Sequence, residues 1–452
     1  MATADADAGS FQQAFNAVHD GWEKRWQDAF TPGNTHYSGS LPVLTTDDAA
    51  VSRLYYMSVL SVLTNERTNL GADFNDVLGR VRGGFSGFDR VYVTGAPEWA
   101  NSVTYFWDTS YCSVVLALLD PTMMSAQTMY WLTQGLDNGY AVDCIQGGPV
   151  GPWYSANDIS VFTTILNYVD YSGDRSALDA TIGADGETGT VLHQLKAIAT
   201  HWRKLVQAGQ PLADYGEDEN LLEVLPNYVH QVSSFNAANV WMMRQVAELC
   251  GRAGDPEAAD VLTGEADALL ADVLDLYDSR NGGVWSCRHA DGSLVPVRTV
   301  VDFAIAGNLL APSLTVEQKT AMKNFVATEL LAGDWMRALS RDDALAPVDR
   351  VDHGTEGAFG SWPALTAQTF ARFGDYPAFL ALLRRFSGVT SRGPFGQSHQ
   401  LRTDDGASHD SSRAVTARAD SLQVFNNLCG GKFADIIISV CSATPRTAPA
   451  LA

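Results

Sequence analysis

The chain has 452 residues, of which 46% are hydrophobic and 18% are charged, a globular composition that can bury a large core. Its 52 acidic and 30 basic residues give a formal net charge of −22. A field of that sign repels phosphate backbones and anionic lipid surfaces, so we expect neither a nucleic-acid partner nor a membrane. No apolar run reaches the ~18 residues of a membrane span, and the N-terminus has no charged-then-apolar signal pattern. We therefore expect a soluble protein, cytoplasmic or secreted with its signal already removed.

Helical periodicity dominates the chain. In residues 229–250, apolar side chains such as Val232, Met243 and Leu249 recur at three- to four-residue spacing, which is typical of a buried helical stripe. The same pattern predicts helices at 11–30, 48–63, 110–119, 123–136, 156–171, 190–207, 256–277, 301–310, 315–330, 362–373 and 376–386. Short strands or hairpins are predicted at 91–94 and at 283–288 followed by 292–296.

Short breakers join these helices in pairs. The connectors are Asp120-Pro121, Gly254-Asp255-Pro256, Ala311-Pro312-Ser313 and Gly374-Asp375. Such residues end one helix and cap the next, and their repetition predicts stacked helical hairpins. We predict an all-α fold, a closed (α/α)6 barrel over 41–442, with an open helical solenoid as the alternative. A helical and irregular extension is expected at 1–40 and a disordered tail at 443–452.

The long loops of a helical ring collect at one end and carry function more often than its helices do. The first such loop contains Trp107 and Asp108. An indole can stack on a sugar ring, and a carboxylate can accept hydrogen bonds from its hydroxyls. The alternative is a core tryptophan followed by a helix-capping residue.

The most informative loop runs from 214 to 230. Glu223 lies among Leu221, Leu222, Val224 and Leu225, and loss of solvation among apolar neighbours raises the pKa of a carboxyl group. That is the property of a general acid for glycoside cleavage. The alternative is an ordinary capping carboxylate. Asp214 is the second candidate, Asp218 belongs to a solvated charge run, and three later residues could line the same cleft: Tyr228, His230 and Asn236.

Two further loops offer polar and aromatic groups. Residues 352–363 are glycine-rich, which lets the backbone approach a ligand closely. This loop supplies His353, Glu356 as a candidate base and Trp362 as a candidate stacking platform, unless it is simply a flexible lead into a helix. Residues 393–400 supply Gln397 and His399, neutral groups that suit sugar hydroxyls.

Other chemistries find little support. The six cysteines form no CxxC or zinc-type cluster, and most of them lie in apolar runs, as buried small hydrophobic residues do. The chain has no phosphate-binding loop, no HExxH, no GxSxG and no dinucleotide fingerprint. The stretch at 403–406 lacks an EF-hand pattern. We expect no metal and no cofactor.

The order of the loops resembles the six-hairpin glycosidases, in particular glycoside hydrolase families 63, 37 and 78, over about residues 100–400. The matching pieces are Tyr105-Phe106-Trp107-Asp108, Asp120-Pro121, Phe235-Asn236-Ala237-Ala238, Ser361-Trp362-Pro363-Ala364 and Gly393-Pro394-Phe395. The resemblance implies an (α/α)6 barrel and an inverting mechanism, in which one carboxylic acid protonates the leaving oxygen and a second carboxylate activates water.

The resemblance places the acid in the loop before the helix of Asn236, which holds Asp214, Asp218 and Glu223. At the position of the catalytic base, this sequence differs from the family. Family 63 has a glutamate shortly after the Gly-x-Phe motif, where this chain has Gln397, and a glutamine cannot deprotonate water. Glu356 supplies the base, or Asp404 or Asp405 does, or the reaction is not simple hydrolysis.

The leading hypothesis is an inverting, exo-acting glycosidase on a neutral oligosaccharide or glycoside. A polysaccharide lyase or sugar epimerase on the same ring is the first alternative, with Tyr228 and His230 as a proton-transfer pair. A non-catalytic carbohydrate-binding protein is the second. Sugar identity, linkage and oligomeric state are not encoded in these short motifs.

Overall fold

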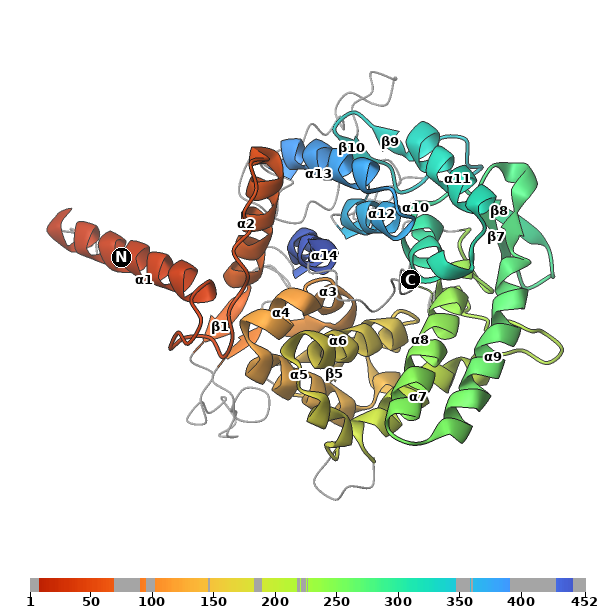
Figure 1. The fold of residues 1–452 in the computed structure, drawn as a ribbon, viewed down its shortest axis with the longest axis horizontal. Helices are drawn as coiled ribbons and strands as arrows, with labels where there is room; N and C mark the ends of the chain where they lie inside the picture. The colour runs from red at the N-terminus through yellow and green to blue at the C-terminus, as the bar shows by residue number, and fades with distance from the viewer. Residues whose placement is uncertain are drawn as a thin grey trace, which may run out of the picture.

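The computed structural model is a ring of paired helices with a few short strands in its loops (Figure 1). It describes residues 8–68, 90–94, 102–144, 147–182, 189–217, 220, 225, 227–346, 358, 361–390 and 428–441. Every segment predicted to be helical contains helix, with ends that differ by a few residues. The helix expected from 229 starts at Ser233 because Gln231 instead forms an antiparallel bridge with Arg288.

Six helices form the inner layer of the ring. They are α4 (Ser113–Leu119), α6 (Asn157–Ser172), α8 (Ser233–Arg252), α10 (Val300–Asp302) with its π-helical continuation η7 (Phe303–Gly307), α12 (Ser361–Arg372) and α14 (Lys432–Cys441). Each contacts the next, and α14 contacts α4. The layer is therefore closed, which rules out the open solenoid and confirms the (α/α)6 prediction.

The outer layer alternates with the inner layer along the chain. It comprises α2 (Ala49–Thr64), α5 (Pro121–Gln134), α7 (Val191–Thr200), α9 (Pro256–Leu274), α11 (Val316–Phe325) and α13 (Tyr376–Thr390). Five hairpins run from an inner helix to the next outer helix. The sixth pairs α14, the last inner helix, with α2, the first outer helix, which also contacts α13.

The short connectors act as the sequence predicted. The Asp255 carboxylate accepts from the backbone N–H of Ala258 at 3.0 Å and caps α9, which begins at Pro256. Thr315 and Gln318 form a capping box at the start of α11. These caps start α9 and α11 within a few residues of the inner helices that precede them, so α8 and η7 are followed closely by their outer partners.

Asp435 joins the last inner helix to the first by hydrogen bonds. Its fully buried carboxylate on α14 accepts from the backbone N–H groups of Val114 at 3.2 Å and Val115 at 2.8 Å. These N–H groups belong to the first turn of α4, whose own N-cap residue, Cys112, provides no side-chain bond. A carboxylate from the last inner helix therefore caps the first one.

The strands are short and lie in the loops. The hairpin expected at 283–296 is present as β7 (Val284–Arg288) and β8 (Leu294–Val297). A third strand, β6 (Tyr277–Asp278), pairs antiparallel with the other edge of β7. Residues 91–94 contribute to β2 (Arg90–Tyr92), which pairs with β1 (Glu66–Thr68). The sequence did not predict β3 (Val103–Tyr105), β4 (Ala141–Asp143), β5 (Pro149–Val150), β9 (Leu331–Ala332) or β10 (Trp335–Met336).

The N-terminal helix α1 (Ala8–Ala29) projects from the ring (Figure 1), but the segment after it is bonded to the barrel. The Gly39 N–H donates to Leu119 O at 3.0 Å. The buried Glu66 carboxylate lies 2.8 Å from His36 Nε2 and 3.4 Å from Arg25 Nε. The predicted boundary at 40 therefore falls within a segment that contacts the ring. The tail predicted at 443–452 lies outside the described residues.

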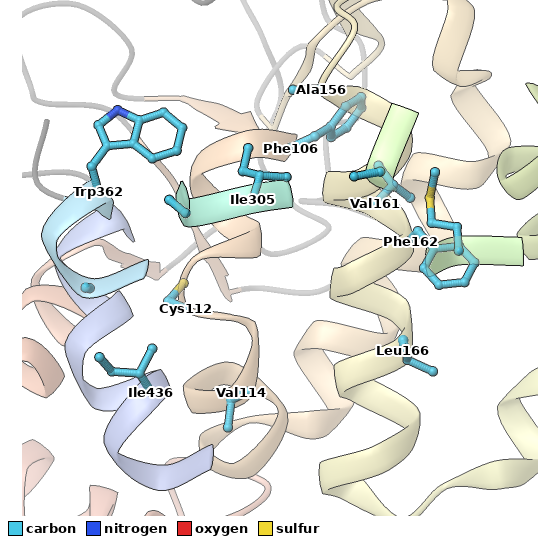
Figure 2. Close-up of a cluster of buried hydrophobic side chains, with 14 of the residues drawn as sticks. Phe106, Cys112, Val114, Ala156, Val161, Phe162, Leu166, Ile305, Trp362 and Ile436 are labelled. Carbon is cyan, nitrogen blue, oxygen red and sulfur yellow. The ribbon is translucent and has the colours of Figure 1, made fainter. Parts of the chain in front are cut away.

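The interior of the ring is filled. Figure 2 shows apolar side chains from different inner helices in one buried cluster, among them Val161 of α6, Ile305 of η7, Trp362 of α12 and Ile436 of α14. Within the described residues, Cys112, Cys144, Cys250, Cys287 and Cys441 form no disulfide. None of the helices in the described part of the chain has the length and apolar character needed to span a bilayer.

Candidate functional site

The functional end of the ring follows from the lengths of its connections. Inner helices lead to outer helices through short connections, except at residues 173–190 between α6 and α7, whereas the segments that return to the inner helices are all longer. These long segments are bonded to one another around the ring. Ser155 Oγ, before α6, donates to Asn220 O at 2.8 Å, and Asn227 Nδ2, before α8, donates to Asp343 Oδ1 at 3.1 Å. Those predicted site residues that the structure describes therefore lie near the starts of inner helices.

Two predicted sugar-stacking residues are in contact. Trp107 lies in the short helix α3 (Phe106–Ser110), and Trp362 lies in the first turn of α12. Their ring centroids are 5.9 Å apart at an interplanar angle of 59°, and Tyr111 packs against Trp107 at 5.0 Å. Trp107 and its neighbour Asp108 are half-buried, whereas Trp362 is 4% exposed. Trp107 is thus the member of the pair that a ligand can reach.

Asp214 and His230 form a second pair. His230 Nδ1 lies 3.0 Å from Asp214 Oδ1 and 3.3 Å from Oδ2. The Gly216 N–H also donates to Asp214 Oδ1 at 2.9 Å. The side chains of Asp214 and His230 are 15% and 17% exposed. Glu217, which is well exposed, brings Oε1 to 3.8 Å from His230 Nε2. An imidazole between two carboxylates can hold or move a proton.

His230 adopts an unusual backbone conformation. Its φ of 62° makes it the one non-glycine residue with a positive φ among the described residues. Such a conformation costs of order 1–3 kcal/mol and persists where the surroundings enforce it. Here the His230 N–H donates to Gly216 O at 2.8 Å and its carbonyl accepts from the Tyr215 N–H at 3.0 Å. The backbone of the 214–216 segment therefore holds His230 beside Asp214.

Tyr228 and Asn236, which we expected to line the cleft, are buried in the core at 1% and 0% exposure. The Tyr228 hydroxyl donates to Asp302 Oδ1 and accepts from the Ser234 N–H. The Asn236 amide bonds the backbone of Ala213. Both side chains support the site from within the protein, and neither is presented to a ligand.

Asp302 is a supporting residue that we did not predict. Burial raises the pKa of its carboxyl group to about 7, although hydrogen bonds from Ser233 and Tyr228 act in the opposite direction. Asp302 is the last residue of α10, and its hydrogen bond from Ser233 links α10 to the first turn of α8. A signal was present in the sequence, since Asp302 interrupts the apolar run Val300-Val301-Asp302-Phe303-Ala304. A carboxyl group inside such a run needs internal hydrogen-bond partners.

The other predicted site residues lie outside the described residues. They are Asp218, Glu223, His353, Glu356, Gln397 and His399, together with the alternative bases Asp404 and Asp405. Their roles stay predictions. Within the described residues, no group of three or more His, Cys, Asp or Glu side chains is arranged to hold a metal ion.

Comparisons with sequences and with structures give different results. No protein-family model and no curated protein matches the sequence. Solved structures do match. A structure titled sialidase aligns with a TM-score of 0.59 at 16% identity, over 88% of this chain and 34% of that one. The family 78 rhamnosidase of Bacillus sp. GL1 aligns with a TM-score of 0.58 at 14% identity, over 88% and 35%. The chain has the fold of the six-hairpin glycosidases.

A third match indicates the extent of the shared domain. The family 63 mannosylglycerate hydrolase of Thermus thermophilus, solved with glucose, aligns with a TM-score of 0.52 at 11% identity, over 86% of this chain and 100% of that one. This chain spans about a third of the sialidase and of the Bacillus rhamnosidase. At these identities the likeness concerns the fold, so activity must be argued from the site.

Proposed function

We propose that the protein is a glycoside hydrolase that cleaves a neutral oligosaccharide or glycoside, acting at a chain end with inversion. The observation that carries the proposal is the Asp214–His230 pair, which lies at the end of the ring where the long loops meet. Trp107, packed against the buried Trp362, lies at the same end and suits a sugar ring, because an indole is broad and apolar. The fold, shared with rhamnosidases and a mannosylglycerate hydrolase, supports the same reaction class.

Each group has a proposed task. Asp214 Oδ1 accepts from the Gly216 N–H and lies 3.0 Å from His230 Nδ1, whereas Oδ2 has a longer contact of 3.3 Å to the same nitrogen, so Oδ2 is the oxygen better placed to accept a hydrogen bond from a sugar hydroxyl. His230 fixes the orientation of that carboxylate. We keep Glu223 as the proposed acid, with Asp214 and Asp218 as alternatives, and Glu356 as the proposed base. In the inverting reaction the acid protonates the leaving oxygen while the base takes a proton from the attacking water.

The lyase and epimerase hypothesis loses its proton-transfer pair. That hypothesis required Tyr228 and His230 to act together on a substrate. The Tyr228 hydroxyl is buried and bonded to Asp302 and Ser234, so it has no path to a ligand. We therefore carry hydrolysis as the single proposed reaction.

The test is turnover of α- and β-linked disaccharides, oligosaccharides and aryl glycosides, followed by early-time proton NMR of the released sugar. We expect one substrate to release a sugar of inverted anomeric configuration. Asp214→Asn should lower kcat by roughly 100-fold or more, within the range of a lost proton-transfer or orienting group. Glu223→Gln and Glu356→Gln should lower kcat at least as much if they are acid and base.

Asp278→Asn is a matched control. Asp278 is 18% exposed and accepts from the N–H two residues ahead at 2.9 Å, as Asp214 does, but its carboxylate pairs with Arg280 and not with a histidine. It should leave kcat unchanged. If no substrate turns over while one still binds, hydrolysis is wrong, and uronate polymers would be tested for elimination before the protein is treated as a binding protein.

A further inference from the structure

The segment that carries Asp214 is anchored on both sides of that residue. Leu212 and Ala213 are 0% exposed and Tyr215 is 3% exposed. The Asp214 N–H donates to Leu205 O at 2.9 Å, and Ala213 forms an antiparallel bridge with Val206. Side chains alternate in extended backbone, so burying Ala213 and Tyr215 turns Asp214 to the opposite side, toward His230.

Asn236 holds this segment from the inner helix α8. Its Oδ1 accepts from the Ala213 N–H at 3.0 Å, and its Nδ2 donates to Ala213 O at 3.1 Å and to Val232 O at 2.9 Å. The N–H and the carbonyl of Ala213 are therefore both bonded to the side-chain amide of Asn236. Ala213 has only a methyl side chain, which cannot fix the segment by packing. The amide of Asn236 does so instead.

We propose that Asn236 is a positioning residue, which places the Asp214 carboxylate against His230 by holding the backbone of Ala213. The inference rests on the proposed function of that pair. One helical turn along α8, Asn239 Nδ2 donates to the Tyr215 hydroxyl at 2.7 Å and anchors the residue on the other side of Asp214. Two asparagines on one rigid helix thus flank the carboxylate.

The coupling from Asn236 to His230 is direct. Asp214 is bonded covalently to Ala213, and the next two residues exchange backbone hydrogen bonds with His230. A shift of Ala213 therefore changes the contact of 3.0 Å between Asp214 Oδ1 and His230 Nδ1. Catalytic geometry is sensitive on this scale, since a displacement of about 1 Å can cost about 100-fold in rate.

The experiment compares Asn236→Ala with a matched control, Asn157→Ala. Asn157 is also a buried asparagine in the first turn of an inner helix, α6, and its Nδ2 donates to Leu136 O at 2.9 Å and Gly139 O at 2.8 Å. Neither of these hydrogen bonds involves Asp214 or the backbone around it. Both variants lose bonds to buried backbone groups, so both should lower the thermal midpoint. Only the first should disturb the site.

Two readouts are measured on the full chain. The first is the 15N spectrum of the histidine side chains, with His230 assigned by His230→Gln. This spectrum reports whether Nδ1 carries the proton that it donates to Asp214, and it needs no substrate. The second is kcat and KM on whichever glycoside the panel identifies. We expect Asn236→Ala to alter the His230 signals and to lower kcat at least tenfold with KM within about threefold. Asn157→Ala should keep the parent's His230 signals and kcat.

The outcomes separate this inference from the proposed function. If Asn236→Ala shows the parent's His230 signals, or no greater loss of kcat than Asn157→Ala, the positioning role is wrong. If its His230 signals change while the parent protein hydrolyses no glycoside, Asn236 does position the pair, and hydrolysis is wrong. Should Asn236→Ala fail to fold, Asn239→Ala tests the second anchor with the same readouts, and unchanged His230 signals there would overturn the inference.

Discussion

Asp435 caps α4 from the far end of the chain, and replacing it with asparagine should change how stability depends on pH. Burial raises the pKa of Asp435 to about 7 from an ordinary 3.8, although Lys432 and the backbone N–H groups of Val115 and Val114 act in the opposite direction. Between these two pH values the folded protein holds a proton that the unfolded chain has lost. Stability must therefore fall as the pH rises through this window, and this contribution levels off above pH 7.

The magnitude follows from the shift. A difference of ~3 pKa units corresponds to ~4 kcal/mol over the whole window, or ~1.4 kcal/mol per pH unit. Asparagine does not titrate, but its Nδ2 cannot accept the second of the two backbone N–H groups that bond Asp435. We expect Asp435→Asn to carry a cost of about 1–3 kcal/mol that does not depend on pH. Relative to the parent, its free energy of unfolding should rise by roughly 2–3 kcal/mol between pH 5 and pH 7.

The assay is urea unfolding followed by tryptophan fluorescence at pH 5, 6, 7 and 8, with equal m-values required of both proteins. Asp278→Asn is the control. Hydrogen bonds from Arg280 lower the pKa of Asp278, so Asp278 is ionised throughout this range and its loss should leave the slope unchanged. Parallel stability curves for the parent and Asp435→Asn between pH 5 and 7 would refute the reasoning.

Three further predictions concern other parts of the ring. Glu66→Gln should destabilise the protein by about 3 kcal/mol in urea unfolding, because the partly buried guanidinium groups of Arg25 and Arg90 would lose the buried carboxylate that they face; a loss below ~1 kcal/mol would contradict this. Gly283→Ala should cost at least ~2 kcal/mol more than Gly282→Ala: both glycines have positive φ, but only a Cβ at 283 would meet the backbone of α11, at 2.5 Å. Equal costs would mean that the backbone of α11 shifts to make room for the Cβ, which would contradict this prediction. Trp107→Ala should weaken sugar binding about tenfold in calorimetry, because its half-buried ring is the proposed platform; unchanged affinity would remove it from the site.

The helices and their pairing were determined locally by the sequence. Apolar residues at three- to four-residue spacing marked each amphipathic helix, and connectors such as Asp255-Pro256 marked the turns. Both signals lie within a few residues of the structure they specify. The helix α14 was not predicted, although Lys432, Asp435 and Ser439 recur at three- to four-residue spacing in its sequence. What the sequence does not reveal is that Lys432 and Asp435 are themselves buried in the packed ring. The pairing of α14 with α2 joins residues as far apart as Ser58 and Ala434.

For the candidate site, too, the sequence determined some features and the tertiary structure determined others. Residue type and loop position led us to propose Trp107, Trp362, Asp214 and His230, and the structure places these four at one end of the ring, while their roles stay predictions. Tertiary structure alone decided that Tyr228 faces Asp302, 74 residues away, rather than a ligand. Closing the ring determines which side of each loop is covered, and that depends on segments far apart in the sequence. A loop sequence can therefore state which groups are present, but only the packed ring decides which of them solvent or substrate can reach.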